Sequence, residues 1–304
     1  MAGAPGPRVV SVADLLAPLA AVVPPEMLGG VSPKGTSFGA SPAPTFSLNE
    51  LAAAHGIATG DGKPLRFVSP GGSTLAYEER AWLHGEVETR ADNWHDAFNA
   101  LVWLAYPRAK AALNRKHYRT MTERRALGCR DRGRLRDALT QFDECGLVVA
   151  CADMSLWQGI SAHRWREVFA DRRAEVEAKM RFFLFGHASM ESLRVPFVGL
   201  TAKALCLEVD AIWFEQPLMA QLAAVDTWLA GRIDATDETF RSTFQPLPLL
   251  GIPGVTPDSE DPAYYDDTAQ FRPKRLQCDP EVRQAVAASQ GVEESPGPIE
   301  QDAG

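Results

Sequence analysis

The segment 94–118 constrains the fold of this chain most, because it joins a helical repeat of apolar residues to a stripe of polar ones. At about 100° per residue, its hydrogen-bonding side chains fall within an arc of about 100°, and Ala, Leu, Val and Phe cover most of the remaining surface. The stripe, which Leu113 interrupts, consists of His95, Asn99, Trp103, Tyr106, Lys110, Asn114 and His117. The pattern predicts a mostly apolar helix with one polar face.

Pro107 is expected to kink this helix or to split it, because proline lacks the amide hydrogen and its ring collides with the preceding turn. The sequence then does not determine how far one half is rotated about the helix axis relative to the other. Neighbours within each half remain on one face, because they lie three, four or seven residues apart. These neighbours are His95 with Asn99, and Lys110 with Asn114 and His117.

Two interpretations of the polar stripe remain open. A solvent-facing stripe would normally carry Glu, Lys and Arg rather than Trp and Tyr, and a fully buried one needs a partner for each polar group. The stripe is therefore either the wall of a half-buried cleft or a face whose hydrogen bonds anchor loops and N-terminal segments.

Cap signals predict where two helices begin. Ser47 and Glu50 form a capping box for a short helix that Gly56 ends. Asn93 is placed to cap the helix that follows it. Asp96 can either stabilise the start of that helix or support the neighbouring His95.

The other segments predict a mixture of helices and short strands. Residues 146–153 are expected to form a buried strand, and residues 60–90 short extended pieces. A helix is expected to begin at Ser161 and run towards Lys179. The remaining assignments are helices at 132–144, around 187–193 and at 217–233, strand or helix at 181–186 and 201–209, and a Pro-rich loop at 245–273.

These elements predict an α+β fold: a single, mostly helical domain with a few short strands. Residues 1–45 form a loop-rich extension, residues 46–275 the main globular domain, and residues 276–304 an acidic tail. The tail has few large apolar residues to offset the entropy of ordering, so it is expected to be disordered.

Composition excludes several classes of protein. The net charge of −8 and the pI of about 5.3 argue against a nucleic-acid-binding protein, although arginines gather between Arg115 and Arg136. No run approaches the roughly 18 apolar residues of a membrane helix. Five cysteines without a CxxC pair suggest neither a zinc ribbon nor a disulfide framework, so a cytoplasmic protein is expected. The fingerprints of dinucleotide binding, P-loops, α/β-hydrolases and zincins are absent.

Further candidate residues lie outside the stripe. Asp143 and Glu144 precede the predicted buried strand, where carboxylates serve as catalytic groups, as metal ligands or only as turn residues. His187 and Glu191 are four residues apart, so on a helix they would form half of a divalent metal site. The third ligand would come from His95, His117 or Asp143. A simple hydrogen-bonded pair is the alternative.

Five segments in order resemble a bacterial family catalogued as domain of unknown function 3025. They are 93–117, 136–146, 185–193, 247–254 and 264–273. The similarity runs from about Phe67 to Pro273 and implies a bacterial cytoplasmic protein, but no activity. The positions that match the motifs are Trp94, His95, Asp96, Asn99, Lys110, Asn114, His117, Asp137, Asp143, Glu144, His187 and Glu191.

Three functional hypotheses follow. The first is a hydrolase-type enzyme, in which His95 or His117 is the general base, a carboxylate orients it and Lys110 holds a small anionic substrate. A divalent metal on His187 and Glu191 is a variant of this hypothesis. The second is a non-catalytic module that binds a small molecule or a protein through the Trp103–Tyr106 face. Nucleic-acid binding by the arginine-rich stretch is the third, and the negative net charge disfavours it. The oligomeric state is left open.

Overall fold

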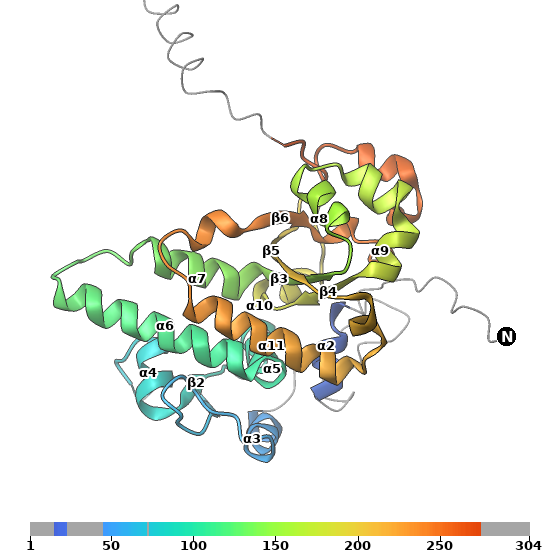
Figure 1. Ribbon diagram of the computed structural model, residues 1–304. Coiled ribbons are helices and arrows are strands. Elements are labelled where there is room, and N and C mark those ends of the chain that lie inside the picture. Colours follow the sequence, from blue (N-terminus) through green and yellow to red (C-terminus); the bar gives the residue numbers. More distant parts are fainter. Residues whose placement is uncertain (1–14, 23–44, 72, 275–304) are drawn as a thin grey trace, which may run out of the picture. The chain divides into compact units, whose positions relative to one another are not determined.

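The computed structural model describes residues 15–22, 45–71 and 73–274 (Figure 1). Over these residues the chain has the predicted α+β fold, mostly helical with short strands in two small sheets. The acidic tail expected to be disordered, and most of the predicted N-terminal extension, lie outside the described residues. Within that extension, however, Leu16 and Leu19 are buried in the hydrophobic core, the latter in helix α2 (Ala17–Val22).

The larger sheet has the strand order β4-β3-β5-β6. Strand β3 (Gly146–Cys151) pairs antiparallel with β4 (Met180–Leu184) and parallel with β5 (Thr201–Glu208), which pairs antiparallel with β6 (Gln245–Pro248). Every residue of β3 is buried, as its uninterrupted apolar run requires of a central strand. The predicted strand at 146–153 is thus confirmed, and the two segments left open between strand and helix are strands.

The long helix splits at the proline into α5 (Trp94–Ala105) and α6 (Pro107–Ala126). Tyr106 leaves helical geometry, with φ −128° and ψ 57°. Proline suits the first position of α6, because an amide hydrogen there would have no partner within the helix. Asn93 caps α5 as predicted, since its side chain accepts a hydrogen bond of 2.9 Å from the backbone N of Asp96.

The start of α6 is capped by a different helix. Helix α11 (Leu218–Asp234) runs beside α6 (Figure 1), and its Asp226 carboxylate accepts hydrogen bonds from the backbone nitrogens of Arg108 at 3.1 Å and Ala109 at 2.8 Å. A carboxylate is favoured there because the first amides of a helix are unpaired and partly positive.

Two helix ends meet beside the sheet. Helix α7 (Arg134–Cys145) buries Leu135, Ala138, Leu139 and Phe142, which recur at helical spacing, and runs directly into β3. Helix α10 (His187–Ser192) starts where β4 ends, and it packs on α5 and α7. Gly186, just before α10, approaches so closely that a Cβ on it would lie 2.5 Å from the Cα of Cys145. This approach brings the start of α10 to the end of α7.

The N-terminal part of the main domain differs from the prediction. Helix α3 (Thr45–Ala54) begins two residues before Ser47, so the predicted capping box is wrong. Residues 60–90, expected to be extended, contain helix α4 (Tyr77–His84) between the short parallel strands β1 (Arg66–Val68) and β2 (Glu86–Glu88). The cap position of α4 is Ala76, which offers no side-chain oxygen, so the usual start signal is missing from the sequence.

The region around residue 161 also required correction. Helix α8 (Met154–Ser161) ends at the residue where a helix was expected to begin, and Asp153 caps it by accepting from the backbone N of Ser155. A π-helical turn (Glu167–Asp171) and helix α9 (Arg173–Lys179) complete this segment. The predicted loop at 245–273 holds β6 and several short 3-10 turns. None of the helices in the described residues is both long and apolar enough to span a membrane.

Candidate metal centre

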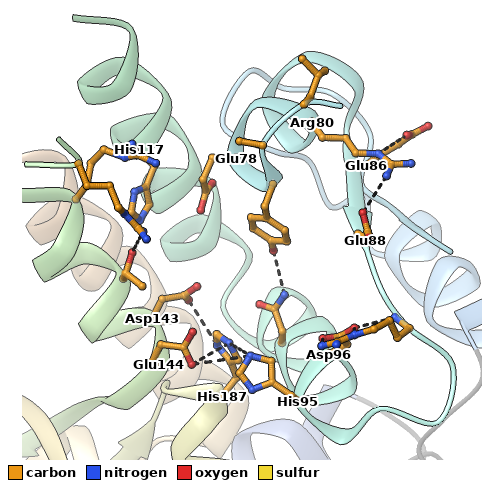
Figure 2. Close-up of a pocket in the computed structure, with 18 residues that line it drawn as sticks. Glu78, Arg80, Glu86, Glu88, His95, Asp96, His117, Asp143, Glu144 and His187 are labelled. Atoms are coloured by element: carbon orange, nitrogen blue, oxygen red, sulfur yellow. Dashed lines mark hydrogen bonds and ion pairs between the residues drawn. The ribbon is translucent and has the colours of Figure 1, made fainter. Parts of the chain in front are cut away.

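Helices α4, α5, α6, α7 and α10 contribute side chains to a polar pocket with a volume of about 550 Å³ (Figure 2). Most of its charged wall residues are already paired. For example, Nε of Arg80 lies 3.0 Å from a carboxylate oxygen of Glu86, and its Nη1 lies 3.2 Å from a carboxylate oxygen of Glu88. The unpaired groups therefore indicate what the pocket could bind.

Two histidines and a carboxylate meet at one end of this pocket (Figure 2). His95 lies in the first turn of α5, Glu144 in the last turn of α7, and His187 begins α10. The Nε2 atoms of the two histidines are 3.2 Å apart, and a Glu144 oxygen lies 3.4 Å from His187 Nε2 and 3.9 Å from His95 Nε2.

The spacing of these donor atoms suits a metal ion. A point equidistant from three atoms with these separations lies roughly 2.1 Å from each of them. Zinc bonds to histidine nitrogen and carboxylate oxygen are about 2.0–2.2 Å long. The three side chains could therefore hold one divalent ion after little or no movement.

Each histidine also has a carboxylate near its other ring nitrogen. Glu191 lies 3.1 Å from Nδ1 of His95, and a carboxylate oxygen of Asp143 lies 3.9 Å from the buried Nδ1 of His187. Histidines that bind metals commonly donate their second N–H to such a carboxylate, which fixes the tautomer and the ring orientation. A hydrogen bond from His95 Nδ1 to Glu191 would leave Nε2 of His95 free to act as a ligand, whereas His187 Nδ1 has no hydrogen-bond partner within the described residues.

The structure thus changes the partner that was expected for His187. The sequence paired His187 with Glu191 as ligands, but Glu191 contacts the far side of the His95 ring, and Glu144 lies in the ligand position instead. Of the three candidates for a further ligand, His95 is in the cluster and Asp143 lies behind His187. Figure 2 shows His117 apart from these groups.

The electrostatics of the cluster favour a cation. Burial lowers the pKa of His187 to about 4, so its imidazole is neutral at pH 7, as a metal ligand must be. Burial and the neighbouring Asp143 raise the pKa of Glu144, because its negative charge is poorly solvated there. A bound cation would relieve this cost.

Lys110 has a different role from the one expected. It is only 2% exposed, and its Nζ donates to both Asp143 oxygens at 2.7 and 3.0 Å and to Asn99 Oδ1 at 2.8 Å. Burial would raise the pKa of Asp143, but Lys110 beside it lowers that pKa below its ordinary value. Lys110 therefore keeps the carboxylate behind His187 ionised and is not available to hold a substrate.

Tyr77 is a pocket residue that the sequence did not reveal, because it lies in the unexpected helix α4. Its hydroxyl oxygen accepts hydrogen bonds from Asn99 Nδ2 at 3.0 Å and from Trp103 Nε1 at 3.3 Å. With both lone pairs engaged, its own hydrogen has no acceptor among the described residues and can point into the pocket. Burial raises the pKa of Tyr77, so the hydroxyl stays protonated at neutral pH.

Asp96 and Asn114 stabilise the pocket wall. The Asp96 carboxylate accepts from Nε, Nη2 and the backbone N of Arg90, at 2.7–2.8 Å, and Asp96 lies in the first turn of α5, where a carboxylate stabilises the helix start. Asn114 donates to the Glu78 carboxylate at 2.8 Å and accepts from Gly60 N at 3.3 Å. The polar stripe is therefore both a cleft wall, around His95, and an anchor, around Asn114.

The face proposed for docking a partner is not available. Trp103 is 1% exposed and Tyr106 is fully buried, with its hydroxyl donating to the backbone oxygen of Leu184 at 3.1 Å. Both side chains belong to the hydrophobic core. A binding module would have to use the polar pocket instead.

Comparison with known proteins identifies the family. No curated protein and no solved structure matches the chain. A family model with the description "Protein of unknown function (DUF3025)" matches residues 65–275, which is more than half of the chain and contains all the pocket residues described above. The chain therefore belongs to the DUF3025 family, as the five motifs suggested.

Proposed function

We propose that this protein is a metal-dependent hydrolase whose pocket binds one divalent transition-metal ion. His95 Nε2, His187 Nε2 and a Glu144 oxygen are its ligands. One observation carries the proposal: the two Nε2 atoms converge with a Glu144 carboxylate oxygen, while the Glu191 carboxylate lies 3.1 Å from Nδ1 of His95, on the far side of that ring. Such a carboxylate is the partner that metal-binding histidines commonly have at their second nitrogen.

The donor set is suited to catalysis rather than to a purely structural site. Structural zinc sites are closed by four protein ligands, whereas catalytic sites use three and leave a position for water or substrate. Two histidines and one glutamate are such a set. A divalent ion held by these three side chains would supply Lewis acidity, which lowers the pKa of a water ligand to about 7 and so activates water for hydrolysis at neutral pH.

Tyr77 adds a hydrogen-bond donor to the same pocket. Its hydroxyl is held by Asn99, which lies four residues after His95 and so one turn further along α5. A fixed donor beside the reacting bond stabilises the negative charge that develops on oxygen during hydrolysis. The Lys110–Asp143 pair positions His187 from behind and does not touch the substrate.

Oxidation chemistry is the second candidate, because two histidines and one carboxylate also bind non-haem iron(II) in oxygenases. Hydrolysis is preferred because it needs only the ion, water and a donor such as Tyr77. The identity of the bound metal separates the two, since iron(II) would favour oxidation and zinc hydrolysis.

The test is a metal-reconstitution assay. Chelator-treated protein is supplied with Zn²⁺, Mn²⁺ or Co²⁺ and assayed on nitrophenyl esters, phosphoesters and peptide amides. Turnover should depend on the metal, disappear in His187→Ala and His95→Ala, and persist in His55→Ala, which changes an exposed histidine. Metal-loaded protein that hydrolyses none of these bonds, or activity that survives His187→Ala, would count against the hydrolase.

A further inference from the structure

Helix α7 carries a basic and an acidic side chain on the face that lines the pocket. Arg136, Thr140 and Glu144 recur every four residues, and all three line the pocket. Glu144 belongs to the proposed metal centre at the end of the helix. Arg136 lies eight residues earlier, which is about 12 Å along the helix axis. The pocket therefore extends along α7 from the metal centre to a guanidinium group.

Two polar side chains at the Arg136 end lack partners. The Nε of Arg136 is buried, and no hydrogen bond to its guanidinium occurs within the described residues. His117 is only 3% exposed, and its buried Nδ1 is likewise unpartnered in that part of the chain. Buried N–H groups are normally paired, because losing water without a replacement costs folding free energy.

The charges around Arg136 leave it without a close counter-ion. Glu79 is paired with Arg125 at 2.9 Å. Asp137 lies 3.7 Å from the Nε of Arg132. Glu78 also faces this end of the pocket, but its carboxylate accepts from Asn114 Nδ2 at 2.8 Å and makes no ion pair within the described residues. Arg132 lines the same wall, but it donates to Thr140 Oγ1 in addition to its pairing with Asp137, so Arg136 is the one of these two guanidiniums without a counter-ion among the described residues.

We infer that Arg136 and His117 bind the anionic group of the substrate, a phosphate or a carboxylate, while the bond to be hydrolysed reaches the metal centre. Arginine presents a planar fork of donors that matches both kinds of oxyanion, and His117 adds an N–H from the neighbouring helix α6. The substrate class is thus a small organic anion. The assignment of this group as part of a substrate rests on the proposed hydrolase, whereas anion binding does not.

The arrangement differs from the expectation that Lys110 holds the anion. Lys110 neutralises Asp143 beneath the metal centre, while Arg136 on α7, at the other end of the pocket, has a buried Nε without a partner among the described residues. The arginine-rich stretch of the sequence therefore contributes to a small-molecule site through Arg132 and Arg136.

The experiment measures binding of inorganic phosphate and of acetate by calorimetry to the His187→Ala protein, which removes one proposed ligand and so keeps phosphate from binding at a metal. Arg136→Met in that background should weaken anion binding at least tenfold, and Arg136→Lys, which keeps the charge without the fork, should weaken it less. The matched control is Arg134→Met, an exposed arginine on the same helix. A phosphate preference over acetate points to a phosphorylated substrate, and the reverse to a carboxylate.

The outcomes separate this inference from the proposed function. If phosphate and acetate both fail to bind, or bind as tightly to Arg136→Met as to Arg134→Met, the anion site is wrong whether or not the protein binds metal. If Arg136 is needed for anion binding but no metal binds to the unmodified protein, the anion site stands and the hydrolase falls. Should Arg136→Met not fold, as judged by circular dichroism, Arg136→Lys replaces it: weaker anion binding than in Arg134→Met supports the anion site, and equal binding contradicts it.

Discussion

The Nε2 atoms of His95 and His187 lie 3.2 Å apart although the two residues are 92 positions apart in the sequence. Two nitrogen lone pairs at this distance repel one another unless a proton or a cation lies between them. Glu191, 3.1 Å from Nδ1 of His95, favours a hydrogen on that nitrogen, and a cation bound by both Nε2 atoms, as proposed above, would account for the approach.

The carboxylate behind His95 should affect metal binding without being a ligand. Replacing Glu191 with Gln keeps the shape of the side chain but removes the charge that orients the imidazole and strengthens it as a ligand. We expect about a 10–100-fold weaker affinity for Zn²⁺, measured by competition with a chromogenic chelator. Glu238→Gln, an exposed control, should leave the affinity unchanged. Equal affinities in the two variants would show that Glu191 does not support the site.

The Lys110–Asp143 pair should contribute strongly to stability. Lys110→Met leaves the largely buried Asp143 without its counter-ion, so the free energy of unfolding in urea should fall by about 3–5 kcal/mol. Adding Asp143→Leu should recover much of the loss, because it removes the uncompensated charge. Lys63→Met, an exposed control, should have little effect. A double variant that is no more stable than Lys110→Met would argue against this explanation.

Histidine 187 should make the metal-free protein sensitive to acid. In the unfolded chain its imidazole takes up a proton near pH 6.5, whereas burial lowers its pKa in the folded protein to about 4. Protonation therefore favours the unfolded state over this interval, and stability that is present above pH 6.5 is lost as the pH falls towards 4. One group with this shift accounts for about 3 kcal/mol.

The measurement for this prediction is urea unfolding of chelator-treated protein at pH 7 and pH 4.5. The wild type should lose about 2–3 kcal/mol more than His187→Gln between the two conditions. Parallel losses in the two proteins would mean that His187 titrates normally.

The cap that α11 provides for α6 gives a prediction outside the pocket. Asp226→Ala removes the acceptor for two backbone N–H groups at the start of α6, so the free energy of unfolding should fall by about 1–2 kcal/mol. Asp226→Asn, which retains one acceptor oxygen, should cost less, and the exposed Asp258→Ala should cost almost nothing. An unchanged stability in Asp226→Ala would show that water replaces the cap.

The parts of the fold that the sequence predicted are those that depend on local patterns. Pro107 marked the break between α5 and α6, and the apolar run of β3 marked a buried strand. Helix α4 was missed because its cap position is Ala76 and its apolar residues are few. The sequence likewise has no strong helix-start signal for the beginning of α3 before Ser47.

The candidate site was predictable by residue type but not by partner. All three residues were identified as candidates: His95 from the polar stripe, Glu144 from its place before the predicted buried strand, and His187 from its four-residue spacing to Glu191. That Glu144 rather than Glu191 shares a centre with His187 depends on the close approach of Gly186 to Cys145, which packs α10 against the end of α7. No spacing along the chain encodes that contact.

The measurement that tests the central claim most directly is the metal content of the protein, purified without a histidine tag and analysed by mass spectrometry of the elements. We predict about one equivalent of a divalent transition metal in the wild type and in His55→Ala, and a loss of most of it in His95→Ala, Glu144→Ala and His187→Ala. Wild-type protein that contains no metal, and that binds neither Zn²⁺ nor Mn²⁺ when titrated, would contradict the account.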